Sequence, residues 1–198
     1  MMRAFLGIGL PEACRSAIAR ALGPFRTESG RIAWVREQNL HVTLKFLGEI
    51  RPEQVDGLET LLADAAAGVP YFDFDVAGAG AFPSLRAPRV LWVGIREPLE
   101  LVGKLQQNIE TALSRSGFPR EDRPFHPHVT AGRVKGVLPP GWGDRFVGAL
   151  SGIRFGSARA ASFQLFESRL SPAGATYTVV RDIPLGAGAF ENRLREEQ

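Results

Sequence analysis

The chain has 198 residues, of which 44% are hydrophobic and 23% charged, a balance that is typical of a folded globular protein and excludes a low-complexity or fibrous chain. This length suffices for one large domain or for two fused small lobes. The formal net charge of +3 and the pI near 9.5 favour an anionic partner, such as nucleic acid, over a cationic one.

Cysteine usage and hydropathy limit the cellular setting. Cys14 is the single cysteine, so the sequence excludes an internal disulfide and a cysteine-based zinc site and indicates a reducing cytoplasm. No apolar run approaches the roughly 20 residues needed to span a bilayer. The N-terminus is typical of a strand and not of a signal peptide, so we expect a cytoplasmic protein without membrane contact.

The first half of the chain predicts alternating strands and helices, with a turn-rich stretch at 23–30 and Gly48 and Pro52 ending the central strand. The predicted elements are a strand at 3–10, a helix at 11–22, strands at 31–35 and 39–50, and an amphipathic helix at 52–67.

The second half repeats this alternation. Its predicted elements are strands at 71–82 and 89–95, a helix at 98–116 capped by Gly117, a strand at 126–134, a loop or short helix at 138–152, and strands at 161–170 and 175–185 joined as a hairpin. We expect residues 1–185 to form one domain of two intertwined lobes and residues 186–198 to form an exposed, mobile tail.

A His-Val-Thr triplet occurs once in each half, at residues 41–43 and 128–130, and uses two of the three histidines. Each triplet falls on a predicted strand. Side chains alternate across a strand, so His41 and Thr43 share one face, as do His128 and Thr130. If a pseudo-two-fold axis relates the lobes, the two pairs face each other across a groove.

Two facing imidazoles suit the opening of a cyclic phosphate. In-line displacement needs a base for the attacking water and an acid for the departing ribose oxygen. Histidine, with a pKa of about 6.5, performs either task near neutral pH. Threonine hydroxyls can donate hydrogen bonds to the phosphoryl oxygens, and the scheme requires no metal or cofactor.

The sequence resembles the LigT-like group of the two-histidine phosphoesterase superfamily, the RNA 2′,3′-cyclic phosphodiesterases also called 2′-5′ RNA ligases. The resemblance extends over about the whole chain, through RAFLGIGLP, NLHVTLKFLGEI, GAGAFPSLRAPRVLWVGI and PFHPHVTAGR. A departure is Ala131, where the motif usually carries a larger apolar residue. Together with the pattern of elements, the resemblance implies an α+β fold of two pseudo-symmetric lobes, with antiparallel sheets forming a central groove and helices on the outside.

The resemblance also implies residue roles and substrates. His41 is expected to be the proton donor and His128 the proton acceptor, with Thr43 and Thr130 on the phosphate. Arg133 is expected to hold the phosphate, and Phe5 to stack a base. The implied substrates are RNA ends bearing a 2′,3′-cyclic phosphate, such as tRNA fragments, with joining of RNA ends as a secondary activity and no obligate protein partner.

Plainer readings and other functions stand beside this one. Thr43 and Thr130 suit any strand, Arg133 could be a solvated charge, and Phe5 could be ordinary core. Pro127 follows His126 and indicates an edge or the start of a strand, so a structural role is the favoured interpretation of His126. Two further functions remain open, a metal hydrolase with ligands His41, His126 and His128, and a non-catalytic RNA-binding module.

Overall fold

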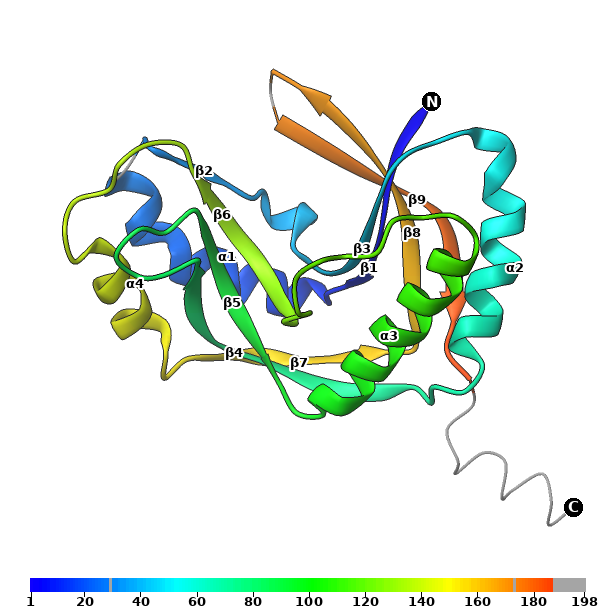
Figure 1. Cartoon of the computed structure of the whole chain (residues 1–198). Helices are drawn as coiled ribbons and strands as arrows, with labels where there is room; N and C mark the ends of the chain where they lie inside the picture. The colour runs from blue at the N-terminus through cyan, green and yellow to red at the C-terminus, as the bar shows by residue number, and fades with distance from the viewer. Residues whose placement is uncertain (29, 173, 187–198) are drawn as a thin grey trace, which may run out of the picture.

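The structure is a computed structural model and describes residues 1–28, 30–172 and 174–186 (Figure 1). The strands are β1 (Met2–Gly9), β2 (Ile32–Trp34), β3 (His41–Ile50), β4 (Phe72–Phe82), β5 (Val90–Arg96), β6 (His128–Val134), β7 (Arg154–Ala160), β8 (Ser162–Ser171) and β9 (Gly174–Pro184). The α-helices are α1 (Glu12–Glu28), α2 (Val55–Ala66), α3 (Leu99–Arg115) and α4 (Trp142–Leu150), and two 3₁₀ turns precede β3 and α2 at Glu37–Asn39 and Pro52–Gln54.

The strands form one curled antiparallel sheet in the order β7-β4-β5-β6-β3-β1-β8-β9, with β2 paired to β6 (Figure 1). One half of the sheet is β3-β1-β8-β9 and contacts α2 and α3, and the other is β6-β5-β4-β7 and contacts α1 and α4. The α+β class with two pseudo-symmetric halves is therefore as predicted. The two halves share a continuous sheet, whose only backbone pair between β3 and β6 is Val42 with Val129.

Alternation along the two central strands separates the core from the polar face. Val42 and Leu44 on β3 and Val129 on β6 are at most 3% exposed, whereas His41 and His128 are only partly buried. Burial of the valine and leucine side chains contributes roughly 1.5–3 kcal/mol each. The pairing register is therefore fixed by the hydrophobic face, and the polar face follows from it.

Two segments differ from the sequence-based prediction. Helix α1 continues to Glu28, through the stretch that the sequence marks as turn-rich, because Phe25 packs edge-on against Trp142 and Phe146 of α4. This burial outweighs the helix-breaking tendency of Gly23 and Pro24.

Strand β7 was not predicted at all. It pairs with β4, and a register shift opposite Gly156 interrupts the alternation that would have marked it as a strand. The predicted cap at Gly117 is confirmed by a φ of 88° and by a hydrogen bond from the Phe118 amide to the Leu113 carbonyl (3.0 Å).

The end of the predicted tail lies outside the described residues, which stop at Gly186. Within them, no helix has both the length and the apolar character that crossing a membrane requires.

Candidate active site

The two His-Val-Thr triplets meet at the centre of the sheet. Because Val42 pairs with Val129 in an antiparallel ladder, His41 lies toward Thr130 and Thr43 lies toward His128. Diagonal neighbours on adjacent strands are about 7–8 Å apart. The antiparallel register therefore places His41 and His128 diagonally across the β3–β6 pair, on one face of the sheet.

Both imidazole rings are held by the same hydrogen bond. The Nδ1 atom of His41 lies 2.7 Å from the Asn39 carbonyl, and that of His128 lies 2.7 Å from the His126 carbonyl. A carbonyl only accepts, so each Nδ1 carries the hydrogen. The lone pair of each neutral ring is therefore on Nε2.

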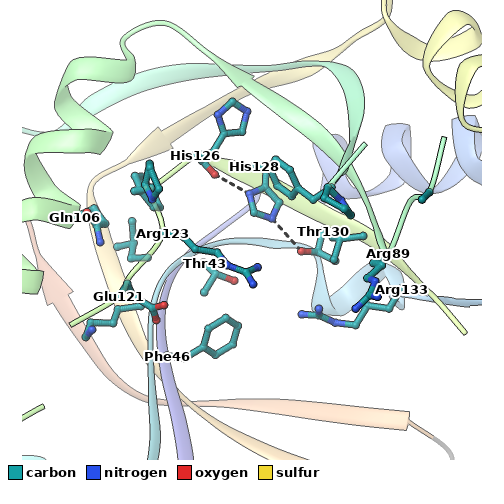
Figure 2. A pocket seen from close by; sticks show the side chains of 18 residues that line it. Thr43, Phe46, Arg89, Gln106, Glu121, Arg123, His126, His128, Thr130 and Arg133 are labelled. Carbon is teal, nitrogen blue, oxygen red and sulfur yellow. Dashed lines mark hydrogen bonds between the residues drawn. The ribbon is translucent and has the colours of Figure 1, made fainter. Parts of the chain in front are cut away.

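The threonines of the triplets contact the Nε2 atoms. His41 Nε2 is 2.9 Å from Thr43 Oγ1, and His128 Nε2 is 3.4 Å from Thr130 Oγ1. Figure 2 shows His128 between its two partners, the His126 carbonyl and the Thr130 hydroxyl. Each threonine can donate to a neutral ring, accept from a protonated one, or turn to a bound anion.

Aromatic rings surround His41 on the side away from β6. Phe5 stacks on the imidazole at 4.8 Å, Tyr177 meets it edge-on at 5.4 Å, and Phe166 lies at 5.8 Å. Phe5 is only 3% exposed, because Phe166 and Tyr177 cover it as well. The Phe5 ring is therefore packed between the His41 and Phe166 rings in this structure, and the stacking of a nucleotide base on it stays a prediction.

His128 has its own aromatic surroundings. Phe82 meets its ring edge-on at 5.2 Å, and Trp92 lies at 6.2 Å. The same two side chains contact His126, at 5.5 and 5.3 Å. Phe82 and Trp92 therefore contact both histidine rings, while the His126 backbone carbonyl, and not its side chain, is the group that orients His128.

A cleft of about 890 Å³ opens beside the triplets (Figure 2). Its lining residues are Thr43, Leu44, Lys45, Phe46, Phe82, Pro83, Ala87, Arg89, Val90, Gln106, Glu121, Arg123, Pro124, Phe125, His126, His128, Thr130 and Arg133. His41 lines an adjoining cavity of about 490 Å³, and its Nε2 reaches Thr43 in the main cleft.

Three exposed arginines line the cleft, of which the sequence analysis identified only Arg133. Arg89 lies just before β5, beside Arg133 in the sheet, and Arg123 lies in the loop before β6. Within the described part of the chain, none of the three has an ion pair. Their charges are therefore available to an anionic ligand. The local sequence around Arg89 and Arg123 gave no sign that these two residues would line the cleft.

The loop between α3 and β6 is fixed by a buried ion pair. Lys45, 3% exposed, contacts Glu110 of α3 at 2.9 Å and also donates to the Pro119 carbonyl at 2.8 Å. Glu110 in turn accepts from the backbone amide of Glu121 at 3.0 Å. Every charged atom of this pair is hydrogen-bonded, as a buried pair requires, and the loop leading to His126 is thereby anchored.

Burial lowers the pKa of both catalytic candidates. The pKa of His41 falls from 6.5 to about 4, chiefly through desolvation, while the bond to Asn39 opposes the shift and His128 and Arg133 add to it. The pKa of His128 is lowered by the same main cause, with contributions from His126 and Arg133. Both rings are thus neutral at pH 7, and a bound anion would raise both pKa values.

The three-histidine metal site that the sequence left open is not formed. Within residues 1–28, 30–172 and 174–186, no three His, Cys, Asp or Glu side chains converge as metal ligands. The Nδ1 atoms of His41 and His128 are engaged by carbonyls, and the His126 ring packs between Phe82 and Trp92.

Comparison with known proteins gives a consistent assignment. The family model "LigT like Phosphoesterase" matches the chain twice, at residues 8–92 and 93–177, so that each match contains one His-Val-Thr triplet. The chain is 34% identical to an RNA 2′,3′-cyclic phosphodiesterase of Methanothermobacter thermautotrophicus over 89% of this chain and 95% of that protein. It is 31% identical to the protein of the same name from Thermotoga maritima, over 94% and 97%.

Solved structures agree with the sequence relatives. The crystal structure of Escherichia coli LigT complexed with 3′-AMP superposes with a TM-score of 0.74 and 31% identity, covering 93% of this chain and 98% of that one. A Thermus thermophilus protein, TT0787, superposes equally well, with 30% identity over 94% and 99% of the two chains.

The close approach of His41 to β1 makes Gly7 a sensitive position. A Cβ atom there would lie 2.8 Å from the Val42 carbonyl and 3.1 Å from the His41 ring. We expect Gly7→Ala to destabilise the fold by about 1–3 kcal/mol and to displace the His41 ring. Urea unfolding and the NMR signals of the ring measure both effects. Gly9→Ala is the control, because its Cβ would meet nothing closer than Gln164 at 3.5 Å; equal effects of the two variants would contradict the expectation.

The lowered pKa of His41 predicts how stability depends on pH. Between pH about 6.5 and about 4 the unfolded chain binds a proton at His41 that the folded chain does not, so stability falls as the pH falls. The resulting loss of folding free energy, complete below pH about 4, is on the order of 3 kcal/mol. Denaturant unfolding of wild type and His41→Gln across this range measures it. We expect the variant to have the flatter dependence, and parallel curves would exclude the buried neutral imidazole.

Proposed function

Because the chain belongs to the LigT-like phosphoesterase family, we propose that it is an RNA 2′,3′-cyclic phosphodiesterase that hydrolyses terminal cyclic phosphates to 2′-phosphates. One observation carries the proposal. Two imidazoles, each with its Nε2 beside a threonine, lie on adjacent antiparallel strands next to a cleft whose arginines form no ion pair with any described residue.

The proposed reaction is an in-line displacement at phosphorus. His128 Nε2 takes a proton from water as the water oxygen attacks phosphorus. The bond between phosphorus and the 3′ oxygen breaks, and that oxygen receives a proton from His41 Nε2. The products are a 2′-phosphate and a 3′-hydroxyl, so atoms and charge balance without a metal. The direction, with His41 as donor, follows the family.

Thr43, Thr130 and Arg133 are proposed to hold the phosphate. Each threonine hydroxyl is within hydrogen-bond reach of the reacting nitrogen of its own triplet, so it also lies beside the reacting phosphate. Arg133, unpaired within the described residues, would contact the non-bridging oxygens as charge accumulates there.

The lowered pKa fits the proposed role of His128 as base but opposes the proposed role of His41 as acid. A lowered pKa keeps His128 neutral near pH 7, which is the state that a base requires. His41 has to be protonated to act as the acid, and its pKa of about 4 leaves it neutral near pH 7. The negative charge of the substrate is proposed to supply the missing stabilisation of the imidazolium.

The same site would also join RNA ends. A 5′-hydroxyl in place of water would attack the cyclic phosphate and give a 2′-5′ bond, which we regard as secondary. We further propose that the substrates are RNA ends in the cytoplasm, such as tRNA fragments. A non-catalytic RNA-binding module is the competing function, and it would bind such ends without releasing a 2′-phosphate.

Substitution of the histidines tests the proposal. We expect His41→Gln and His128→Gln each to lower kcat by about 10² to 10⁴ on a short RNA with a 2′,3′-cyclic phosphate, because each removes one proton transfer. Binding should weaken less, since the threonines and Arg133 remain. His126→Gln is the matched control: its backbone carbonyl persists, so less than tenfold should be lost.

The assay is run with a chelator, and the position of the product phosphate is identified. A 3′-phosphate product would mean that the wrong bond breaks and that the roles of the two histidines must be redrawn. Loss of wild-type activity on chelation would count against metal-independent catalysis. Equal activity of His41→Gln and His126→Gln would show that His41 is not the general acid.

The rate should show a bell-shaped dependence on pH. The active form has His41 protonated and His128 neutral, although His41 has the lowered pKa of about 4. For kcat/KM, which reports the free protein, we expect an optimum below pH 6.5. For kcat the optimum should move to higher pH, because the bound phosphate raises both pKa values. A monotonic profile, or a kcat/KM optimum above pH 7, would be incompatible with these roles.

A further inference from the structure

The backbone carbonyl that holds the His41 ring belongs to a buried residue that makes a second bond. Asn39 is 8% exposed, and its side-chain Nδ2 donates to the Ala175 carbonyl of β9 at 2.7 Å. Its own carbonyl accepts from His41 Nδ1, also at 2.7 Å. Asn39 therefore links the proposed acid on β3 to the C-terminal hairpin, 136 residues further along the chain.

The part of the hairpin that Asn39 contacts extends beyond the strand beside it. The pairing of β8 with β1 covers Gln164 to Glu167, and past this point β8 and β9 project from the sheet as a ribbon (Figure 1). We call residues 168–171 and 174–178 of this ribbon the hairpin tip. A two-stranded ribbon is marginally stable in water, so the tip requires packing against another element.

The hairpin tip packs on the turn before β3 and on the proposed acid. Gly174 lies against Arg36, where a Cβ atom would come within 3.7 Å of the guanidinium. Tyr177 meets the His41 ring edge-on at 5.4 Å. The side chain of Asn39 adds the hydrogen bond between the tip and this turn. The contacts that hold the tip in place are thus also contacts that surround the imidazole.

The position of the Asn39 carbonyl matters because it decides which ring nitrogen carries the hydrogen. In a neutral imidazole the hydrogen is placed by the hydrogen bond that the ring makes. The Asn39 carbonyl keeps it on Nδ1 and so leaves the lone pair on Nε2, the atom that is proposed to carry the transferred proton. A displaced carbonyl would allow the ring to turn or to change tautomer.

We propose that Asn39 is a positioning residue for the proposed acid: by bonding the hairpin tip, its side chain fixes the backbone carbonyl that orients His41. The inference rests on the proposed function, which it extends from the reacting residues to the C-terminal hairpin. In this role Asn39 acts through His41 and not on the substrate. Loss of its side chain should therefore lower kcat more than it changes substrate binding.

The test compares Asn39→Ala with Asn108→Ala on a short RNA with a 2′,3′-cyclic phosphate. Asn108 is the matched control, because its Nδ2 donates to the Ala65 carbonyl at 3.0 Å and links α3 to α2. We expect the two variants to lose similar stability in urea, since each leaves a backbone carbonyl without its partner. Only Asn39→Ala should lower kcat, by about tenfold, with KM within about twofold. If Asn39→Ala does not fold, Asn39→Leu replaces it, because leucine fills a similar volume without the donor.

Nitrogen NMR of the His41 ring near pH 7 gives a readout that does not depend on turnover. We expect the hydrogen on Nδ1 in the wild type and in Asn108→Ala, and a mixture of both tautomers in Asn39→Ala. If Asn39→Ala keeps the wild-type tautomer, or if its kcat equals that of Asn108→Ala, the inference is overturned and the phosphodiesterase function stands. If the wild type does not hydrolyse the RNA, the proposed function fails, and the tautomer comparison alone decides whether Asn39 positions the ring.

Discussion

The candidate site depends on one short junction in the sheet, the antiparallel pairing of Val42 with Val129. Both valines are buried, so hydrophobic packing fixes which residues of β3 and β6 face the groove. A slip of one residue on either strand would turn its histidine into the core. The hydrogen bonds from Nδ1 to the carbonyls of Asn39 and His126 then leave the lone pair of each neutral ring on Nε2.

The two halves reach the same ring orientation with different surroundings. His41 stacks on Phe5 and lies close over β1, where Gly7 leaves room for it. On the other side Phe82 and Trp92 hold both His126 and His128. The two halves therefore preserve the orientation of the imidazole rings and not the packing around them, so two chemically identical side chains lie in different surroundings.

The sequence predicted those parts of the site that depend on local periodicity. The His-x-Thr spacing predicts which side chains share a strand face, and the structure places both pairs there. Positions that depend on irregularity were not predictable. The register shift at Leu44 brings Phe46 into the cleft, and only the packing of α3 brings Gln106 to it. The burial of Phe5 was not predictable either, because an aromatic on a strand gives no local sign of whether its ring is covered.

Electrostatic interactions determine how the proposed site would work without a metal. Desolvation is the main cause that lowers the pKa of both imidazoles, and the positive charge of Arg133 lowers both further. In the proposed mechanism the bound phosphate is anionic, so its charge raises both pKa values and favours a protonated imidazole. A neutral ligand of the same shape would leave both rings unprotonated, so in this mechanism selectivity for phosphate and activation of the acid follow from the same electrostatic interaction.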